Sequence, residues 1–142
     1  MSVPKRETQF SCPVRVYYED TDAGGVVYYA NYLKFMERAR TEWLRTLGFE
    51  QDALREREGL LFVVSRISLD YQRPARLDDL LDIGVELAQA GAASLVFSQD
   101  VMRRADGALC CRGQARIACV DARTLKPKRI PDKLMAEIAD VL

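Results

Sequence analysis

The sequence contains no histidine, and this absence excludes several kinds of active site. A serine or cysteine nucleophile activated by histidine, a histidine-ligated zinc ion and an imidazole general base all need this side chain, because it alone titrates near neutral pH without perturbation. Any catalysis by this chain must therefore use carboxylates, tyrosines, thiols or backbone dipoles.

The chain also lacks any excess of charge and any long apolar run. Its 21 Lys and Arg residues balance 21 Asp and Glu residues, so nothing favours the phosphates of a nucleic acid as a partner. The first residues, MSVPKRETQF, are charged and contain no apolar core of a signal peptide. No later run approaches the ~18 apolar residues of a membrane span. These features predict a soluble, cytoplasmic protein.

The four cysteines show no C-x-x-C spacing, so they predict neither a zinc knuckle nor a redox pair. They are Cys12, Cys110, Cys111 and Cys119. We interpret them as buried free thiols in a reducing compartment. With 142 residues, the chain is long enough for one hydrophobic core, which predicts a single domain over 1–142 with a loose tail over 1–10.

A strand and a long helix are predicted in the first third of the chain. From Cys12 to Tyr18 the residues are mostly β-branched or aromatic, which is typical of a strand. From Asn31 to Leu47 apolar residues recur at intervals of three and four, so one amphipathic helix is predicted. Asn31 is expected to cap this helix, and Gly48 to end it in a left-handed conformation. A weaker helical turn is expected from Glu50 to Arg57.

After Gly59 the hydrophobic pattern changes to the alternation that is typical of strands. The predicted strands cover Arg66 to Gln72, Leu81 to Ala88, Ser94 to Arg104 and Leu109 to Val120, and the last two flank a hairpin turn at Asp106-Gly107. Pro131 is expected to open a short terminal helix that buries Leu134 and Ile138.

Short connections between successive strands predict an antiparallel sheet, and only the long helix is large enough to cover its apolar face. The sequence therefore predicts an α+β domain in which a curved antiparallel sheet of about five strands wraps one central helix.

The segment Tyr17 to Tyr32 concentrates three acids, two glycines and several tyrosines between a strand and a helix. By composition alone, a surface turn before a helix is its simplest interpretation. A calcium loop starting at Asp20 fails, because Gly24 and Asn31 fall where oxygen-rich ligands are needed. The glycine motifs of nucleotide-binding loops are also missing.

The run YYEDTDAGGVVYYANYLKFMERARTEWL closely resembles the active-site segment of the 4-hydroxybenzoyl-CoA thioesterase family, in particular of its Tol-Pal system-associated acyl-CoA thioesterases. The resemblance continues through FVVSRISLDYQRPARLDDLLDI, SLVFSQ and CVDARTLKPKRIP, so it covers nearly the whole chain. The pattern D-x-D-x-x-G-V-V-Y-x-x-x-Y before the helix is long and highly specific. Membership implies the hotdog fold, a helix wrapped by an antiparallel sheet, which agrees with the architecture predicted above.

By position, the resemblance implies that Asp22 is the catalytic carboxylate and that Asp20 supports the turn. Tyr29 stands where the hydroxybenzoyl-CoA enzyme has a tyrosine near the reacting acyl group, whereas Tol-Pal-associated members usually have histidine. This departure explains how a member can contain no histidine. The segment further implies substrate contacts by three of its residues, Tyr18, Gly25 and Val26.

The implied chemistry is hydrolysis of an acyl thioester. A thioester lacks the resonance protection of an amide, so it needs only an activated water or a carboxylate nucleophile, and a donor for the developing oxyanion. Asp22 can act as the nucleophile or as the general base. The family uses a backbone N–H at a helix start as the donor, which we expect within Gly59 to Val63.

Coenzyme A carries phosphates, and several basic residues are candidates to bind them: Arg66, Arg73, Arg76, Lys126, Lys128 and Arg129. Each of them is also well explained as a solvated surface charge. The hydroxybenzoyl-CoA enzyme has a basic cluster where this chain has Gly91-Ala92-Ala93, so that nucleotide contact is not transferred.

These expectations together define an acyl-CoA thioester hydrolase that needs no metal and no redox cofactor. A hydroxyacyl dehydratase of the same fold is excluded, because its proton shuttle uses histidine. The alternative is a non-catalytic partner that binds acyl thioesters or acyl carrier protein in an envelope or lipid-synthesis complex. We expect a homodimer or homotetramer, because hotdog protomers commonly pair with the acyl site at the interface and a lone sheet would leave its edges exposed.

Overall fold

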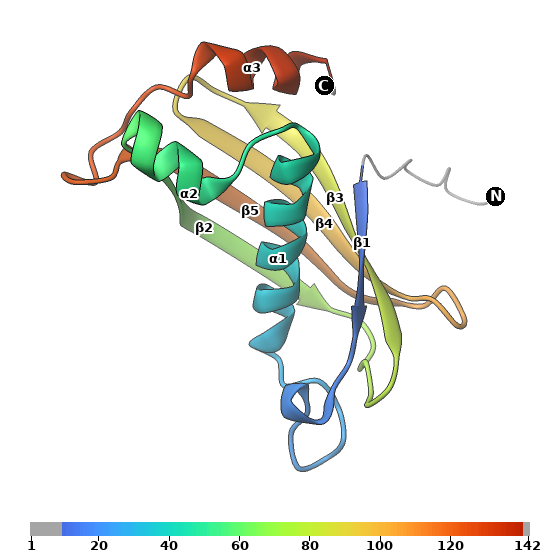
Figure 1. Cartoon of the computed structure of the whole chain (residues 1–142). Coiled ribbons are helices and arrows are strands. Elements are labelled where there is room, and N and C mark those ends of the chain that lie inside the picture. Colours follow the sequence, from blue (N-terminus) through green and yellow to red (C-terminus); the bar gives the residue numbers. More distant parts are fainter. Residues whose placement is uncertain (1–9, 141–142) are drawn as a thin grey trace.

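A five-stranded antiparallel sheet curves around one long helix in the computed structural model, which describes residues 10–140 (Figure 1). The strands are β1 (Phe10–Arg15), β2 (Leu60–Tyr71), β3 (Leu80–Ala90), β4 (Ser94–Arg103) and β5 (Leu109–Asp121). Their order in the sheet is β1-β3-β4-β5-β2, so β1 and β2 form the two edges. The predicted α+β hotdog architecture is confirmed. The predicted tail over 1–10 lies outside the described residues, except for Phe10, which begins β1.

The long helix α1 (Asn31–Thr46) presents its apolar stripe to the concave face of the sheet. Phe35, Met36 and Ala39 are each at most 1% exposed. At Gly113 of β5, an added Cβ atom would lie 2.7 Å from the Leu69 side chain and 3.0 Å from the end of the Met36 side chain. Glycine at this position therefore allows the helix to pack directly on the strand.

The expected cap of α1 by Asn31 is wrong. The helix begins at Asn31 itself after Ala30, and no side chain caps it. The Asn31 amide instead donates from Nδ2 to the carbonyl oxygen of Asp20, at 2.9 Å. At the other end, Gly48 has φ of +88°, so the predicted left-handed ending is confirmed.

The first strand differs from the prediction at both ends. It begins at Phe10 because Phe10 pairs with Val85 of β3. It ends at Arg15 rather than Tyr18, because residues 18–20 form a short 3₁₀ turn, η1 (Tyr18–Asp20). The strand-like residue pattern therefore extends beyond the end of β1, because local hydrogen bonds fold residues 18–20 into a turn.

Besides η1, residues 10–140 form three shorter helical segments, of which α2 (Gln51–Ala53) lies beside α1 and α3 (Asp132–Ala139) lies across one end of the sheet (Figure 1). The predicted turn over 50–57 is a single turn of helix, α2, followed by the π-type turn η2 (Leu54–Glu58). The predicted terminal helix is α3, which follows Pro131 and fully buries Leu134 and Ile138. Within residues 10–140, no helix has the length and apolar character that crossing a bilayer requires.

All four cysteines are free and buried, as predicted. Burial raises the pKa of the Cys111 thiol to about 12, since removal from water disfavours the thiolate. These thiols are therefore packing groups under α1 and between strands rather than nucleophiles.

The edge strand β2 leaves apolar side chains in solvent. Val64, Ile67 and Tyr71 are 50%, 37% and 50% exposed. They pair with Ile117, Ala115 and Cys111 of β5, which are buried on the side of the sheet that faces α1. Strand β2 is thus a long unpaired edge with an apolar face, a feature that usually marks an interface.

One buried polar contact joins α1 to the middle of the sheet. Arg40 donates from Nη1 to Oε1 of Gln99 at 2.9 Å, and Gln99 donates from Nε2 to the carbonyl oxygen of Met36 at 3.0 Å. Arg40 and Gln99 are only 9% and 2% exposed. Burial lowers the pKa of Arg40, while the negative charge of Glu37 opposes this shift. Gln99 therefore holds a desolvated cation against the sheet.

We expect Gln99→Leu to lower the free energy of unfolding by about 2–4 kcal/mol, because it leaves the buried Arg40 cation without this acceptor. Chemical denaturation at one fixed protein concentration would measure the change. Gln114→Leu, on the exposed side of β5, is the matched control and should have little effect. Equal stability of the two variants would contradict this role of Gln99.

Candidate functional site

The loop between η1 and α1 displays Asp22 on the surface, in a tight turn. Its carboxylate oxygen Oδ1 accepts the backbone N–H of Gly24 at 2.8 Å, and its own N–H donates to the carbonyl oxygen of Val26 at 2.9 Å. Gly25 closes the turn with φ of +78°, which favours glycine. The two glycines therefore let the chain fold back and present one carboxylate in a fixed orientation.

Asp20 supports this turn from within. Its Oδ2 accepts the N–H of Tyr17 at 2.8 Å, and its carbonyl oxygen accepts both the N–H of Tyr28 and the amide of Asn31, each at 2.9 Å. Within residues 10–140, the second acid, Asp22, makes no comparable hydrogen bond to α1. The expected division of roles between a supporting Asp20 and a displayed Asp22 agrees with these contacts.

Tyr29 lies on the same loop, with its ring 62% exposed and packed against the Tyr28 ring at a centroid distance of 4.7 Å. Interaction with Tyr29 raises the pKa of the Tyr28 hydroxyl. Among the contacts of the described residues, none joins the Tyr29 hydroxyl to the Asp22 carboxylate. The structure therefore places the two predicted catalytic residues on one loop without a direct bond between them.

The end of β2 is bound to this loop, which sequence reasoning missed. The Tyr71 hydroxyl donates to the carbonyl oxygen of Tyr29 at 3.0 Å, and the Tyr71 ring packs on Tyr32 at a centroid distance of 5.6 Å. The N–H of Val27 donates to the carbonyl of Ala75 at 2.8 Å. These contacts join residues about 40 positions apart, so no local pattern in the sequence announces them.

The three predicted substrate contacts occupy different places around the loop. Gly25 forms the turn beside Asp22, and Val26 is half-buried and forms an isolated bridge with Arg76. Tyr18 is 83% exposed and lines an open depression with Tyr17 and Leu77. Gly25 and Val26 are thus beside the carboxylate, whereas Tyr18 lies on the flank of the loop.

The loop can do carboxylate chemistry with its own residues. An exposed, oriented carboxylate can attack an electrophilic carbonyl or take a proton from water. Within residues 10–140, no three or more Cys, Asp or Glu side chains gather as a metal site would require. What the loop lacks among the contacts above is a donor for an oxyanion and a wall for the substrate.

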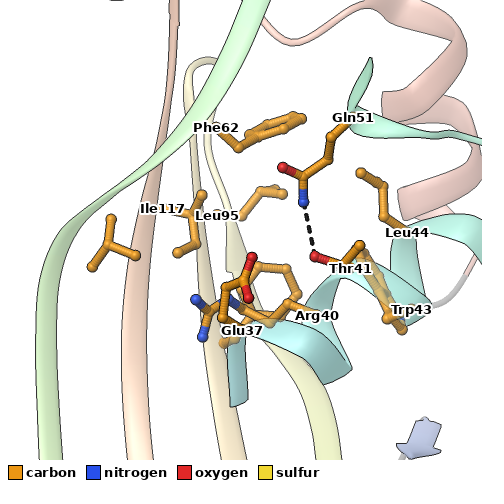
Figure 2. Close-up of a pocket in the computed structure, with 11 residues that line it drawn as sticks. Glu37, Arg40, Thr41, Trp43, Leu44, Gln51, Phe62, Leu95 and Ile117 are labelled. Atoms are coloured by element: carbon orange, nitrogen blue, oxygen red, sulfur yellow. Dashed lines mark hydrogen bonds between the residues drawn. The ribbon is translucent and has the colours of Figure 1, made fainter. Parts of the chain in front are cut away.

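A second hollow lies at the opposite end of α1, between the helix, α2 and the sheet (Figure 2). This cavity has a volume of about 90 Å³. Its apolar walls are formed by Trp43, Leu44, Phe62, Leu95, Phe97 and Ile117. Gln51 of α2 donates to the hydroxyl of Thr41 at 3.0 Å and closes one side. Phe62 and Val64 of β2 also line it.

Arg40 also lines this cavity, and sequence reasoning did not single it out. It follows Met36 by four positions and precedes Trp43 by three, so it lies on the apolar stripe of α1. That spacing was the available signal for a buried charge. Glu37, three residues before Arg40 on α1, is exposed and also lines the cavity (Figure 2).

The basic residues proposed for CoA phosphates form two groups. Arg73 and Arg76 follow β2 beside the Asp22 loop, and Arg66 lies in the middle of β2. Lys126, Lys128 and Arg129 lie near the start of β2, where Lys128 donates from Nζ to the carbonyl oxygen of Glu58 at 2.6 Å. One chain therefore does not gather these charges around Asp22.

Comparison with known proteins identifies relatives over nearly the whole chain. Residues 16–138 match the family described as the thioesterase-like superfamily. The acyl-CoA thioesterase YbgC of Haemophilus influenzae is 49% identical over 127 residues, which cover 89% of this chain and 92% of that protein. The acyl-CoA thioester hydrolase YbgC of Escherichia coli is 48% identical, over 92% of this chain and 96% of its own length.

Solved structures agree with these relatives. A probable thioesterase from Bartonella henselae is 35% identical, superposes with a TM-score of 0.81, and the match covers 86% of this chain and 98% of that one. The family resemblance carried by the Asp20 to Tyr32 motif is confirmed.

We expect Asp20→Ala to lower the free energy of unfolding by about 1 kcal/mol, because the N–H of Tyr17 loses its carboxylate acceptor. Glu19→Ala, at the exposed neighbouring position, is the control and should leave stability unchanged. Urea denaturation of both variants at the same protein concentration would measure the difference. An Asp20 variant as stable as the control would argue against the supporting role.

Proposed function

The chain belongs to the thioesterase-like superfamily, and on this premise we propose that it hydrolyses acyl-CoA thioesters to free acids and CoA, with Asp22 as the catalytic carboxylate. The observation that carries the proposal is the display of the Asp22 carboxylate, fixed by the N–H of Gly24, in the motif shared with the family. Relatives named acyl-CoA thioesterases at 48–49% identity support the reaction class.

Two versions of the reaction use this carboxylate. As a nucleophile, an Asp22 oxygen attacks the thioester carbon, the CoA thiolate leaves, and water then hydrolyses the mixed anhydride. As a general base, Asp22 takes a proton from the water that attacks the same carbon. The sequence contains no histidine, so both versions place the essential negative charge on Asp22.

The oxyanion donor is proposed to come from a second copy of the chain. The N–H of Gly59 already donates to the carbonyl oxygen of Arg55 at 3.2 Å. Among residues 60–63, which pair with β5, the alternate amides that point away from β5 lie on the free edge of β2. These residues begin the strand, whereas Tyr71 at its end contacts the Asp22 loop. Along the strand, Phe62 and Tyr71 are about 30 Å apart. The amides at the start of β2 and the Asp22 loop of the same chain therefore cannot contact one thioester together.

We propose a homodimer formed by antiparallel pairing of β2 with β2 of the second copy. Such pairing places the Tyr71 end of one strand beside the start of the other. The Asp22 loop of one protomer then faces the amides of residues 60–63 of the partner, and the exposed Val64 and Ile67 become buried. A tetramer would be built from two such dimers through another surface.

The same pairing gathers the basic residues. Lys126, Lys128 and Arg129 near the start of one β2 come close to Arg73 and Arg76 beyond the end of the other, which supports phosphate binding beside the thioester. The proposed reaction needs no metal or redox cofactor. The four free buried thiols favour a cytoplasmic location, where acyl carrier protein is a further candidate donor of the thioester.

We expect Asp22→Asn to reduce kcat by at least ~10³ while folding and assembly persist. The amide oxygen of Asn can still accept the N–H of Gly24, but it has neither the charge nor the basicity of the carboxylate. Hydrolysis of a panel of acyl-CoAs would measure this, with Asp20→Asn as the matched control. Full activity of Asp22→Asn would overturn its catalytic role, and a wild-type protein that binds acyl-CoA without turnover would favour the non-catalytic alternative.

Rapid-quench mass spectrometry separates the two versions of the mechanism. A nucleophilic Asp22 gives a transient acyl adduct on the peptide that contains it, whereas a general base stays unmodified at every time point. We favour the nucleophile and therefore expect the adduct.

Tyr29→Phe is expected to lower turnover by about tenfold, or ~1.4 kcal/mol, because a phenol hydroxyl near the acyl group helps orientation without attacking or transferring the proton. Steady-state kinetics would measure the effect. Tyr28→Phe, at the neighbouring position, is the control and should lower turnover less. A defect as deep as that of Asp22→Asn would make Tyr29 a primary catalytic group.

Ile67→Lys is expected to split the dimer, because it places a charge in the proposed β2 interface. Sedimentation should then show the 16.1 kDa monomer, and kcat should fall by about 10²-fold or more as the oxyanion donor is lost. Leu125→Lys, at another exposed apolar residue, is the control and should remain dimeric and active. A wild-type protein that sediments as a monomer would refute the proposed pairing.

A further inference from the structure

The cavity near the C-terminal end of α1 has apolar walls and a buried cation, Arg40, whose guanidinium group has more N–H donors than the one hydrogen bond described above uses. Arg40 is 9% exposed and bonds Gln99 through one nitrogen. Arg40 lines the cavity, and no fully buried side-chain nitrogen in the described part of the chain lacks a hydrogen-bond partner. The ion pairs found among residues 10–140 include neither Arg40 nor Glu37.

Glu37 stands on the rim of the same cavity and acts on Arg40 through its charge. Figure 2 shows both side chains coming from α1, with the sheet residues Leu95 and Ile117 across the hollow. A donor and an acceptor of opposite charge therefore flank the opening. A neutral group that both accepts and donates a hydrogen bond would satisfy the two together.

The size of the cavity favours the end of an aliphatic chain over an aromatic ring as its occupant. A dry cavity of about 150 Å³ accommodates benzene, and this one measures about 90 Å³. Its walls include Trp43, Phe62 and Phe97, which leave a narrow apolar slot. The end of an aliphatic chain fits such a slot.

The cavity is remote from Asp22 of the same chain but close to that of a partner. Asn31 and Trp43 are about 18 Å apart along α1, with Asp22 beyond the Asn31 end. Phe62 and Val64 line the cavity from the first half of β2, the segment that antiparallel pairing brings to the Asp22 loop of the second copy.

Resting on the function and dimer proposed above, we propose that this cavity holds the distal end of the acyl group whose thioester lies at Asp22 of the partner, and that Arg40 and Glu37 select an aliphatic acyl group ending in a hydroxyl. That hydroxyl accepts from Arg40 and donates to Glu37. A terminal methyl group would displace water and leave the Arg40 N–H groups unpaired. A terminal carboxylate would be attracted by Arg40, but it would be repelled by Glu37 and would lose its hydration on entering the apolar cavity.

The single tryptophan of the sequence reports occupancy directly, because Trp43 lines the cavity. The Asp22→Asn dimer would be titrated with saturated acyl-CoAs of increasing length and with their ω-hydroxy counterparts, and with CoA alone as control. We expect a change in Trp43 fluorescence only above a threshold chain length, with tighter binding of the hydroxylated member of each pair. Binding by calorimetry without any Trp43 signal at any length would overturn the inference.

Kinetics of the wild-type enzyme test the selection itself. Above the threshold length, kcat/KM is expected to favour the ω-hydroxyacyl-CoA over the plain chain and over the ω-carboxyacyl-CoA by about tenfold. Glu37→Met and Arg40→Lys should each reduce this preference to near unity. Because Glu37 is exposed, Glu37→Met is expected to fold and can be assayed even if substitution of the buried Arg40 prevents folding.

Arg38→Met is the matched control, since Arg38 is exposed on α1, acts on Cys12 near β1 and does not line the cavity. It should keep the full preference. Equal kcat/KM for each pair in the wild type, or a preference that survives in Glu37→Met, would overturn the role of the cavity. Absence of all acyl-CoA hydrolysis would instead refute the proposed function, so the two failures are distinguishable.

Discussion

The burial of one face of α1 against the concave side of the sheet is the constraint on which the rest of the molecule depends. Gly113 lets the helix approach the strand, and the Arg40–Gln99–Met36 hydrogen bonds fix it beside β4. Once α1 is held, its two ends are fixed as well. One end carries the loop that displays Asp22, and the other forms the cavity around Trp43. A buried charge is costly unless it is bonded, so this contact favours a single position of the helix.

In the proposed dimer, the free edge of β2 divides the site between two chains. Pairing with β5 satisfies one edge of β2, and its apolar residues Val64 and Ile67 remain partly exposed beyond the area that α1 covers. The strand also connects the two regions of interest, since Tyr71 bonds the Asp22 loop and Phe62 lines the cavity. Antiparallel pairing with a second copy would bring the Tyr71 end of one β2 next to the Phe62 end of the other. Assembly and catalysis are therefore linked in the proposed mechanism.

The sequence predicted most of the architecture, because the elements have strong periodic patterns. The stripe from Tyr32 to Trp43 and the alternation from Leu109 to Cys119 each have one dominant interpretation. The errors arose where local hydrogen bonds compete with the pattern: Asn31 bonds Asp20 rather than capping α1, and the Tyr17 to Asp20 turn ends β1 early. The contacts that position the site, such as Tyr71 with Tyr29, join distant segments and left no local signal. Arg40 was overlooked because a charged residue in an apolar stripe is ordinarily assigned to the solvent.

The lack of histidine has a further physical consequence for the site. A carboxylate is a weaker base than an imidazole, so a catalyst that relies on one must gain more from orientation and from stabilisation of the developing oxyanion. Orientation is provided within the chain by Gly24 and Gly25. In the proposed dimer, the start of β2 of the partner would supply the donor for the oxyanion, and the Arg40 cavity beside it would hold the acyl group. Binding energy from the distal end of the acyl group would then help to place the thioester carbon against Asp22, so recognition of the chain end and the rate of the chemical step would be coupled.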